Sequence, residues 1–62
     1  MTIGSQIRKA RQEQGLTQTE LADRAGVSRP TIARVETSED VSTATLEKVA
    51  AALGLRVELR GE

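Results

Sequence analysis

Two arginines close together in the chain, Arg29 and Arg34, carry side chains suited to specific recognition of another molecule. A guanidinium group presents a fork of N–H donors that fits the O6 and N7 atoms of guanine or the oxygens of a phosphate. Ile32 and Val35 have helical spacing and claim the inner face of the segment, so both arginines should point outward. The alternative is that both are ordinary solvated charges.

The residues around these arginines fit the same kind of contact. Hydroxyl groups at Ser28 and Thr31 can bond a base or a phosphate, and the small or apolar Pro30 and Ala33 can contact a thymine methyl group. A helix that enters the major groove of duplex DNA directs its N-terminal residues toward the base edges. The residues expected to contact bases are therefore Ser28, Arg29, Pro30, Thr31, Ala33 and Arg34.

Local capping signals predict two short helices joined by a tight turn. Thr17 and Glu20 have the spacing of a capping box, in which each side chain bonds the backbone N–H of the other residue. Gly26 should end this first helix, because glycine enters the left-handed conformation without strain. Ser28 can cap the second helix, and Pro30 fits its first turn, where a missing N–H has no intrahelical partner. Such a pair is a helix-turn-helix arrangement.

Two further helices are expected on either side of this pair. Apolar residues at helical spacing predict the first from about Ile3 to Gln14, with Gly15 stopping it. Ser42 or Thr43 should cap the last helix, which Gly54 ends. Its apolar face carries Leu46, Val49, Ala50 and Leu53. The expected fold class is therefore all-α, with a bundle of four short helices in residues 1–54.

The end of the chain, residues 55–62, changes to a period of two. Leu55, Val57 and Leu59 alternate with charged residues, which is the pattern of a half-buried strand. A lone strand leaves unpaired backbone groups, and antiparallel pairing with a second copy would give a two-fold dimer. Self-association would also help so short a chain to be stable. The alternative is a frayed tail with chance alternation.

The charges of the chain cancel overall but are unevenly distributed. Six basic and three acidic residues lie in residues 1–34, giving +3, whereas three and six lie in residues 35–62, giving −3. A locally positive half can attract a polyanion such as DNA even when the total charge is zero. Arg8, Lys9 and Arg24 are expected to serve this long-range attraction only.

The composition also excludes several kinds of site. The chain has no Cys, His or aromatic residue, which excludes a disulfide, a Cys/His zinc site and a nucleophile paired with histidine. We expect no metal, no cofactor and no enzymatic activity. The absence of a long apolar run and of a signal-peptide pattern leads us to expect a cytoplasmic protein without a membrane partner.

The stretch from Leu16 to Glu36, LTQTELADRAGVSRPTIARVE, resembles the Cro/lambda-repressor-like helix-turn-helix family, also called the XRE family. With the preceding IRKARQEQG and the later TLEKVAAALG, the resemblance covers most of residues 3–54. It implies a lambda-repressor-like helical bundle that binds double-stranded DNA, usually as a homodimeric repressor on a palindromic operator. The positions matching Ser28, Arg29, Pro30 and Arg34 approach bases in that family.

The resemblance also implies contacts to the DNA backbone. The counterpart of Gln18 contacts a phosphate through its side chain and amide, and a helix N-terminus favours an anion there. Thr17 and Thr19 beside it are expected to join this phosphate contact, while the alternative for Gln18 is a plain surface glutamine. Family members often carry a structural salt bridge at the positions of Arg11 and Glu36, the alternative being a phosphate contact by Arg11.

Two features of the chain lie outside the common pattern. Glu36, Glu39 and Asp40 make the loop after the second helix of the pair acidic where the family often carries phosphate-gripping side chains, so we assign this loop no role on DNA. The ending ALGLRVELR resembles antitoxins of the HigA and HipB type. That resemblance implies a cognate toxin as partner and autorepression, which gives an alternative function to a simple repressor.

Overall fold

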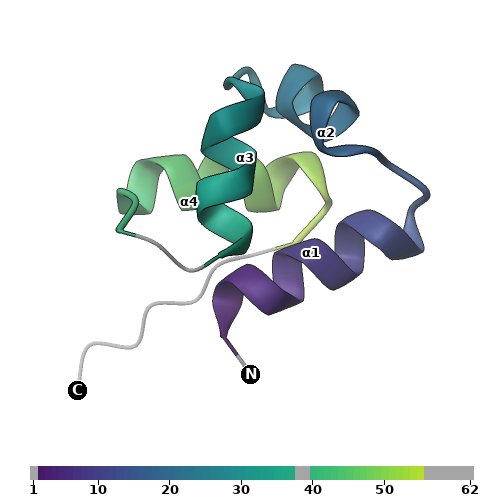
Figure 1. Cartoon of the computed structure of the whole chain (residues 1–62), viewed down its shortest axis with the longest axis horizontal. Coiled ribbons are helices and arrows are strands. Elements are labelled where there is room, and N and C mark those ends of the chain that lie inside the picture. The colour runs from purple at the N-terminus through teal and green to yellow at the C-terminus, as the bar shows by residue number, and fades with distance from the viewer. Residues whose placement is uncertain (1, 38–39, 56–62) are drawn as a thin grey trace.

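The computed structural model describes residues 2–37 and 40–55, and within them helices are the only regular secondary structure (Figure 1). The four helices are α1 (Ile3–Glu13), α2 (Gln18–Ala25), α3 (Arg29–Glu36) and α4 (Thr43–Ala52). The predicted all-α bundle of four short helices is confirmed. The predicted C-terminal strand lies outside the described residues, apart from its first residue, Leu55.

Each helix begins after a Ser or Thr whose side-chain oxygen accepts a hydrogen bond from a backbone N–H one turn later. These N-cap residues are Thr2, Thr17, Ser28 and Ser42. Ser42 rather than Thr43 therefore caps α4. At the turn between α2 and α3, Gly26 takes the left-handed conformation with φ of 72°, and its N–H donates to the carbonyl of Ala22. This glycine reverses the chain without strain, because it lacks a Cβ.

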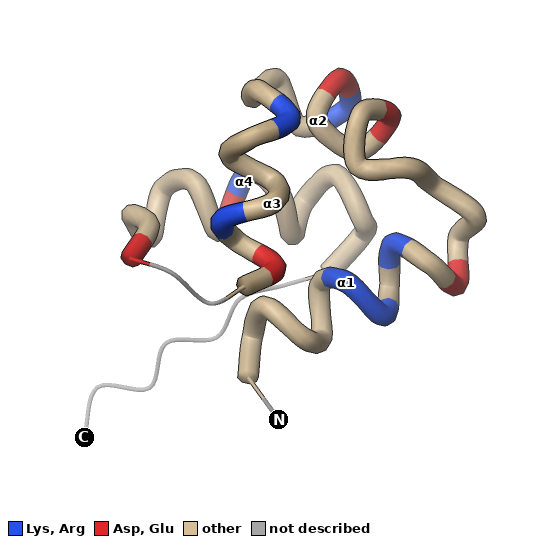
Figure 2. Tube along the Cα trace, in the orientation of Figure 1, with Lys and Arg blue, Asp and Glu red and all other residues tan. Residues whose placement is uncertain are grey.

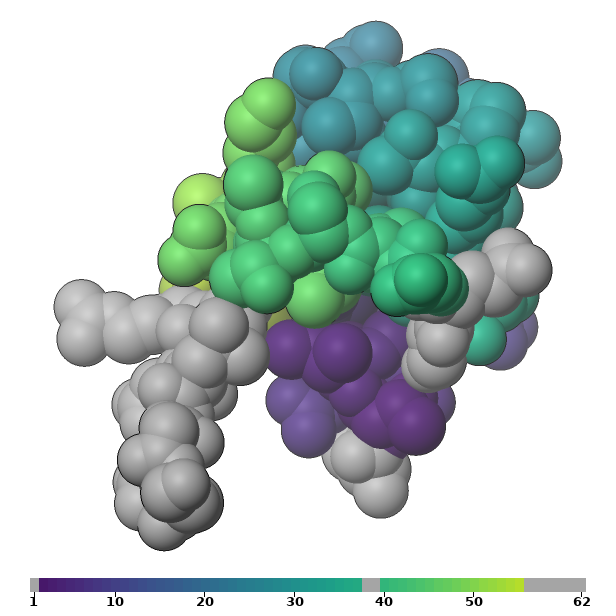
Figure 3. All heavy atoms as spheres, turned by 90° about the vertical axis from the view of Figure 1, so that its left-hand side faces the viewer, coloured from purple at the N-terminus to yellow at the C-terminus, as the bar shows by residue number. Residues whose placement is uncertain are grey.

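The core forms where the apolar faces of the four helices meet. Its largest fully buried side chains are Ile7, Leu21, Ile32, Val35 and Val49. Helix α2 packs against both α3 and α4, and α1 packs against α3. On the face in Figure 3, α4 (green) lies between α1 (purple) and the α2–α3 pair (blue and teal). Burial of one such side chain stabilises the fold by about 1.5–3 kcal/mol, so this small core fixes how α2 and α3 are placed.

Candidate nucleic-acid interface

Helix α3 has one face in the core and the other toward solvent. Ile32 and Val35 are 0% and 1% exposed, which anchors the helix against α1 and α2. Arg29 and Arg34 are both exposed, at the start and near the end of α3, where Figure 2 shows two separate basic segments. The outward position expected for the two arginines is therefore the one the structure shows.

The remaining predicted base-contacting residues lie around the start of α3. Pro30 is exposed in the first turn, and Ala33 is half-buried. The hydroxyls of Ser28 and Thr31 bond each other at 2.9 Å, and the Ser28 hydroxyl also accepts from the Thr31 N–H. One hydroxyl proton serves the contact between the two side chains, so the other is free for an acceptor on a ligand.

The capping box predicted at the start of α2 is present. The Thr17 N–H donates to Glu20 Oε1 at 2.9 Å, and the Glu20 N–H donates to the Thr17 hydroxyl at 3.0 Å. The backbone N–H and hydroxyl of Thr17, which donate to Glu20, together with the Arg24 charge, hold the pKa of the Glu20 carboxyl below its usual range. The box uses the Thr17 N–H, so the N–H groups of Gln18 and Thr19 remain for an anion at this helix end.

Arg11 and Glu36 form an ion pair between α1 and the end of α3. Arg11 Nε donates to Glu36 Oε2, Nη2 donates to Oε1 at 3.1 Å, and Nη1 donates to the carbonyl of Leu16 at 2.8 Å. The two side chains are only 12% and 4% exposed. This is the pairing that the family resemblance implies, and it commits all three guanidinium nitrogens of Arg11 to contacts within the protein.

Sequence reasoning missed the partner of Gln18. Its Nε2 atom donates to Glu36 Oε1 at 3.2 Å, so the side chain is half-buried and held against the end of α3. Gln18 and Glu36 are both polar, but they are 18 residues apart, so no local spacing in the sequence predicts that they meet. Gln14 makes a second contact between distant segments: its Nε2 donates to the carbonyl of Leu53 at 2.8 Å, which links the end of α1 to the end of α4.

The acidic loop after α3 is less acidic than the sequence suggests. Glu36 is the last residue of α3, and its charge is compensated by Arg11 inside the fold rather than exposed in the loop. Asp40 is exposed, and Glu39 lies outside the described residues. Of the three acidic residues counted in the sequence, Glu36 therefore adds no uncompensated charge to this loop.

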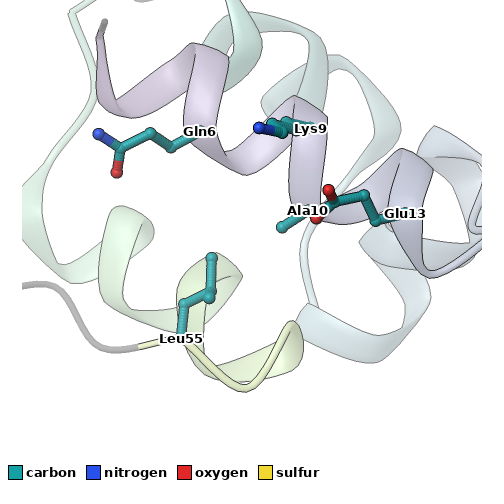
Figure 4. A pocket seen from close by; sticks show the side chains of 5 residues that line it. All are labelled: Gln6, Lys9, Ala10, Glu13 and Leu55. Carbon is teal, nitrogen blue, oxygen red and sulfur yellow. The ribbon is translucent and has the colours of Figure 1, made fainter.

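One open hollow of about 290 Å³ lies away from the helix-turn-helix, between α1 and the segment after α4 (Figure 4). It is lined by Gln6, Lys9, Ala10, Glu13 and Leu55.

In the part of the chain that the structure describes, no group of acidic residues could hold a metal ion. Within that same part, no helix is long and apolar enough to cross a membrane.

Comparison with known proteins points in the same direction as the geometry. A sequence model of the family described as Helix-turn-helix matches residues 7–59. A relative named Immunity repressor protein, from Bacillus phage phi105, is 45% identical over 58 residues. The match covers 92% of this chain but only 40% of that protein, so the chain spans less than half the length of the relative.

Proposed function

The chain belongs to the helix-turn-helix family of DNA-binding proteins of the XRE type, and from this we propose that it is a transcriptional repressor that binds a specific duplex sequence. The observation that carries the proposal is the division of α3 into two faces. Its inner face is locked in the core, while both of its arginines are exposed. The chain would act by binding and not by catalysis.

In the proposed complex, α3 lies in the major groove with its first turn toward the bases. Eight residues of helix are roughly 12 Å long, a length the groove can hold. Arg29 and Arg34 supply forked donors for guanine. Ser28, Pro30, Thr31 and Ala33 supply the remaining base contacts. The start of α2, at Gln18 and Thr19, binds a phosphate, with the Thr17 hydroxyl beside them.

The proposal extends to a homodimer on a palindromic operator. Two copies of α3 related by a two-fold axis and separated by about 34 Å would enter successive major grooves. Two exposed hydrophobic side chains favour self-association, since Leu55 and Ile3 are 42% and 39% exposed. Residues 1–54 would form the DNA-binding domain, and residues 55–62 would pair with their copy through Leu55, Val57 and Leu59. Neither comparison supports the antitoxin alternative or a toxin partner.

Selection of bound duplexes from a randomised pool at stated salt tests the proposed function. We expect enrichment of one motif made of two inverted half-sites, with a complex mass that corresponds to two chains per duplex. A motif without symmetry bound by one chain would contradict the dimer alone. Recovery of no preferred sequence would contradict sequence-specific repression, because affinity from phosphates alone does not distinguish sequences.

A further inference from the structure

The first residue of α2 and the last residue of α3 are joined by a side-chain contact. Gln18 Nε2 donates to Glu36 Oε1, and the same carboxylate takes two hydrogen bonds from Arg11. A carboxamide nitrogen carries two hydrogens, so one N–H of Gln18 is committed to Glu36 and the other is left. The contact also settles which end of the carboxamide faces Glu36, since a carboxylate accepts and cannot donate.

We propose that Glu36 is a positioning residue for binding of the DNA backbone, which holds the Gln18 carboxamide so that its second N–H meets a phosphate. The inference rests on the proposed function and adds a residue that lies outside the expected DNA-contacting set. Glu36 itself, with a side chain only 4% exposed, does not reach the DNA. It acts through Gln18.

Arg11 makes this arrangement compatible with an anionic ligand. A lone carboxylate close to the start of α2 would repel a phosphate and oppose the helix dipole. The two-pronged contact from Arg11 compensates that charge, so Glu36 orients Gln18 without giving the site a net negative charge. The Leu16 carbonyl takes the third nitrogen of Arg11 and fixes this guanidinium just before the α2 cap.

The same contact links two tasks in recognition. Phosphate contacts set the position of a protein on the duplex, and base contacts read the sequence. Because Glu36 ends α3 and Gln18 begins α2, the contact holds the proposed phosphate anchor at a fixed place relative to the base-reading helix. Loss of the contact should therefore weaken binding even where every base-contacting residue is retained.

The test is a cycle of variants measured on the duplex recovered by selection. Gln18→Met removes the donor with little change in side-chain length. R11M/E36L removes the acceptor and its counter-charge together, so no unpaired charge is left buried and the net charge is unchanged. Gln14→Met is the matched control, because Gln14 also donates from Nε2 to a partner inside the protein but lies outside the proposed interface.

We expect Gln18→Met to weaken binding roughly tenfold, a loss typical of one hydrogen bond to a charged group. R11M/E36L should weaken binding by a similar factor, and the triple variant should be no weaker than either parent. The slope of affinity against salt should stay the same in all of them, because no variant alters the net charge. Gln14→Met should bind like the unaltered chain.

The role of Glu36 would be overturned if the triple variant lost affinity by the product of the two separate losses, or if R11M/E36L bound like the unaltered chain. Either result would leave the proposed function intact. Failure of the unaltered chain to select any duplex would overturn both. The side-chain amide signals of Gln18 in NMR spectra give a readout without DNA. The hydrogen bonded to Glu36 should give a signal displaced from those of the exposed Gln6 and Gln12, and a pair of signals at the same positions as theirs would also overturn the inference.

Discussion

Breaking the buried pair between Arg11 and Glu36 should cost more stability than a chain of this length can lose. Arg11→Met leaves a carboxylate that is 4% exposed with Gln18 as its remaining side-chain donor. Glu36→Leu leaves a guanidinium that is 12% exposed and bonded to the Leu16 carbonyl. Leaving one partner of a buried pair alone costs about 3–5 kcal/mol. Domains of this size often have only about 3–5 kcal/mol of stability in total, so each single variant should be largely unfolded at 25 °C.

The double variant R11M/E36L should be far less destabilised than the sum of its parents. Apolar side chains of similar volume replace a buried pair at a cost near zero, because both desolvation penalties disappear together. The coupling free energy from the double-mutant cycle should therefore be at least about 3 kcal/mol. Urea denaturation in the presence of a stabilising osmolyte, which restores a folded population of the single variants, measures the four free energies of unfolding by far-UV circular dichroism.

A coupling below about 1 kcal/mol would refute this reasoning, because that is the range of a solvent-exposed pair. It would mean that Arg11 is hydrated in solution, and a phosphate contact by Arg11 would then become the better interpretation. Arg8→Met is the matched control, since Arg8 lies on the same helix and is exposed. Its change in unfolding free energy should stay within about 0.5 kcal/mol.

Three further predictions concern single residues. Arg34→Ala should weaken binding to the selected duplex by about 1–3 kcal/mol and relax the base preference, as measured by fluorescence anisotropy. Arg24→Ala, in contrast, should weaken all sequences alike, and equal behaviour of the two variants would remove Arg34 from base reading. Gly26→Ala should lower the unfolding free energy by about 1 kcal/mol, because the φ of 72° is strained for alanine, whereas Gly26→Asn should cost less in the same urea titration. Glu20→Gln should be less stable than the unaltered chain at neutral pH. The pKa of folded Glu20 lies below its ordinary value of 4.5. The difference in unfolding free energy between the unaltered chain and Glu20→Gln should therefore be largest above pH 4.5 and vanish as the pH falls through the folded pKa. A difference that does not change with pH would show that the ionised carboxylate is not what stabilises the cap.

The helix ends and the buried faces could be predicted because their causes lie within a few residues of sequence. The Thr17–Glu20 box, the left-handed Gly26 and the cap at Ser28 are each local, and the structure shows all three. The first helix ends at Glu13, one residue before the predicted Gln14, which is its C-cap. Such a difference is ordinary for a fraying last turn.

The contacts between distant segments could not be derived in this way. Gln18 meets Glu36 because the packing of α2 on α3 brings their ends together, and no periodicity in the sequence encodes that meeting. The family resemblance supplied the pair of Arg11 with Glu36, but it suggested Gln18 as a ligand for phosphate only. The strand of residues 55–62 remains a prediction because all but its first residue lies outside the described residues. The base contacts remain predictions because they involve a second molecule, the DNA.

The two faces of α3 also bear on how such a protein can acquire new targets. The residues that anchor the helix, Ile32 and Val35, are separate from the exposed Arg29, Pro30 and Arg34. Exposed substitutions usually change folding free energy by no more than about 0.5 kcal/mol, whereas core substitutions cost several times more. Mutations can therefore change the outward residues while the fold is kept. After a gene duplication, one copy could acquire affinity for another operator through a series of variants that all remain folded.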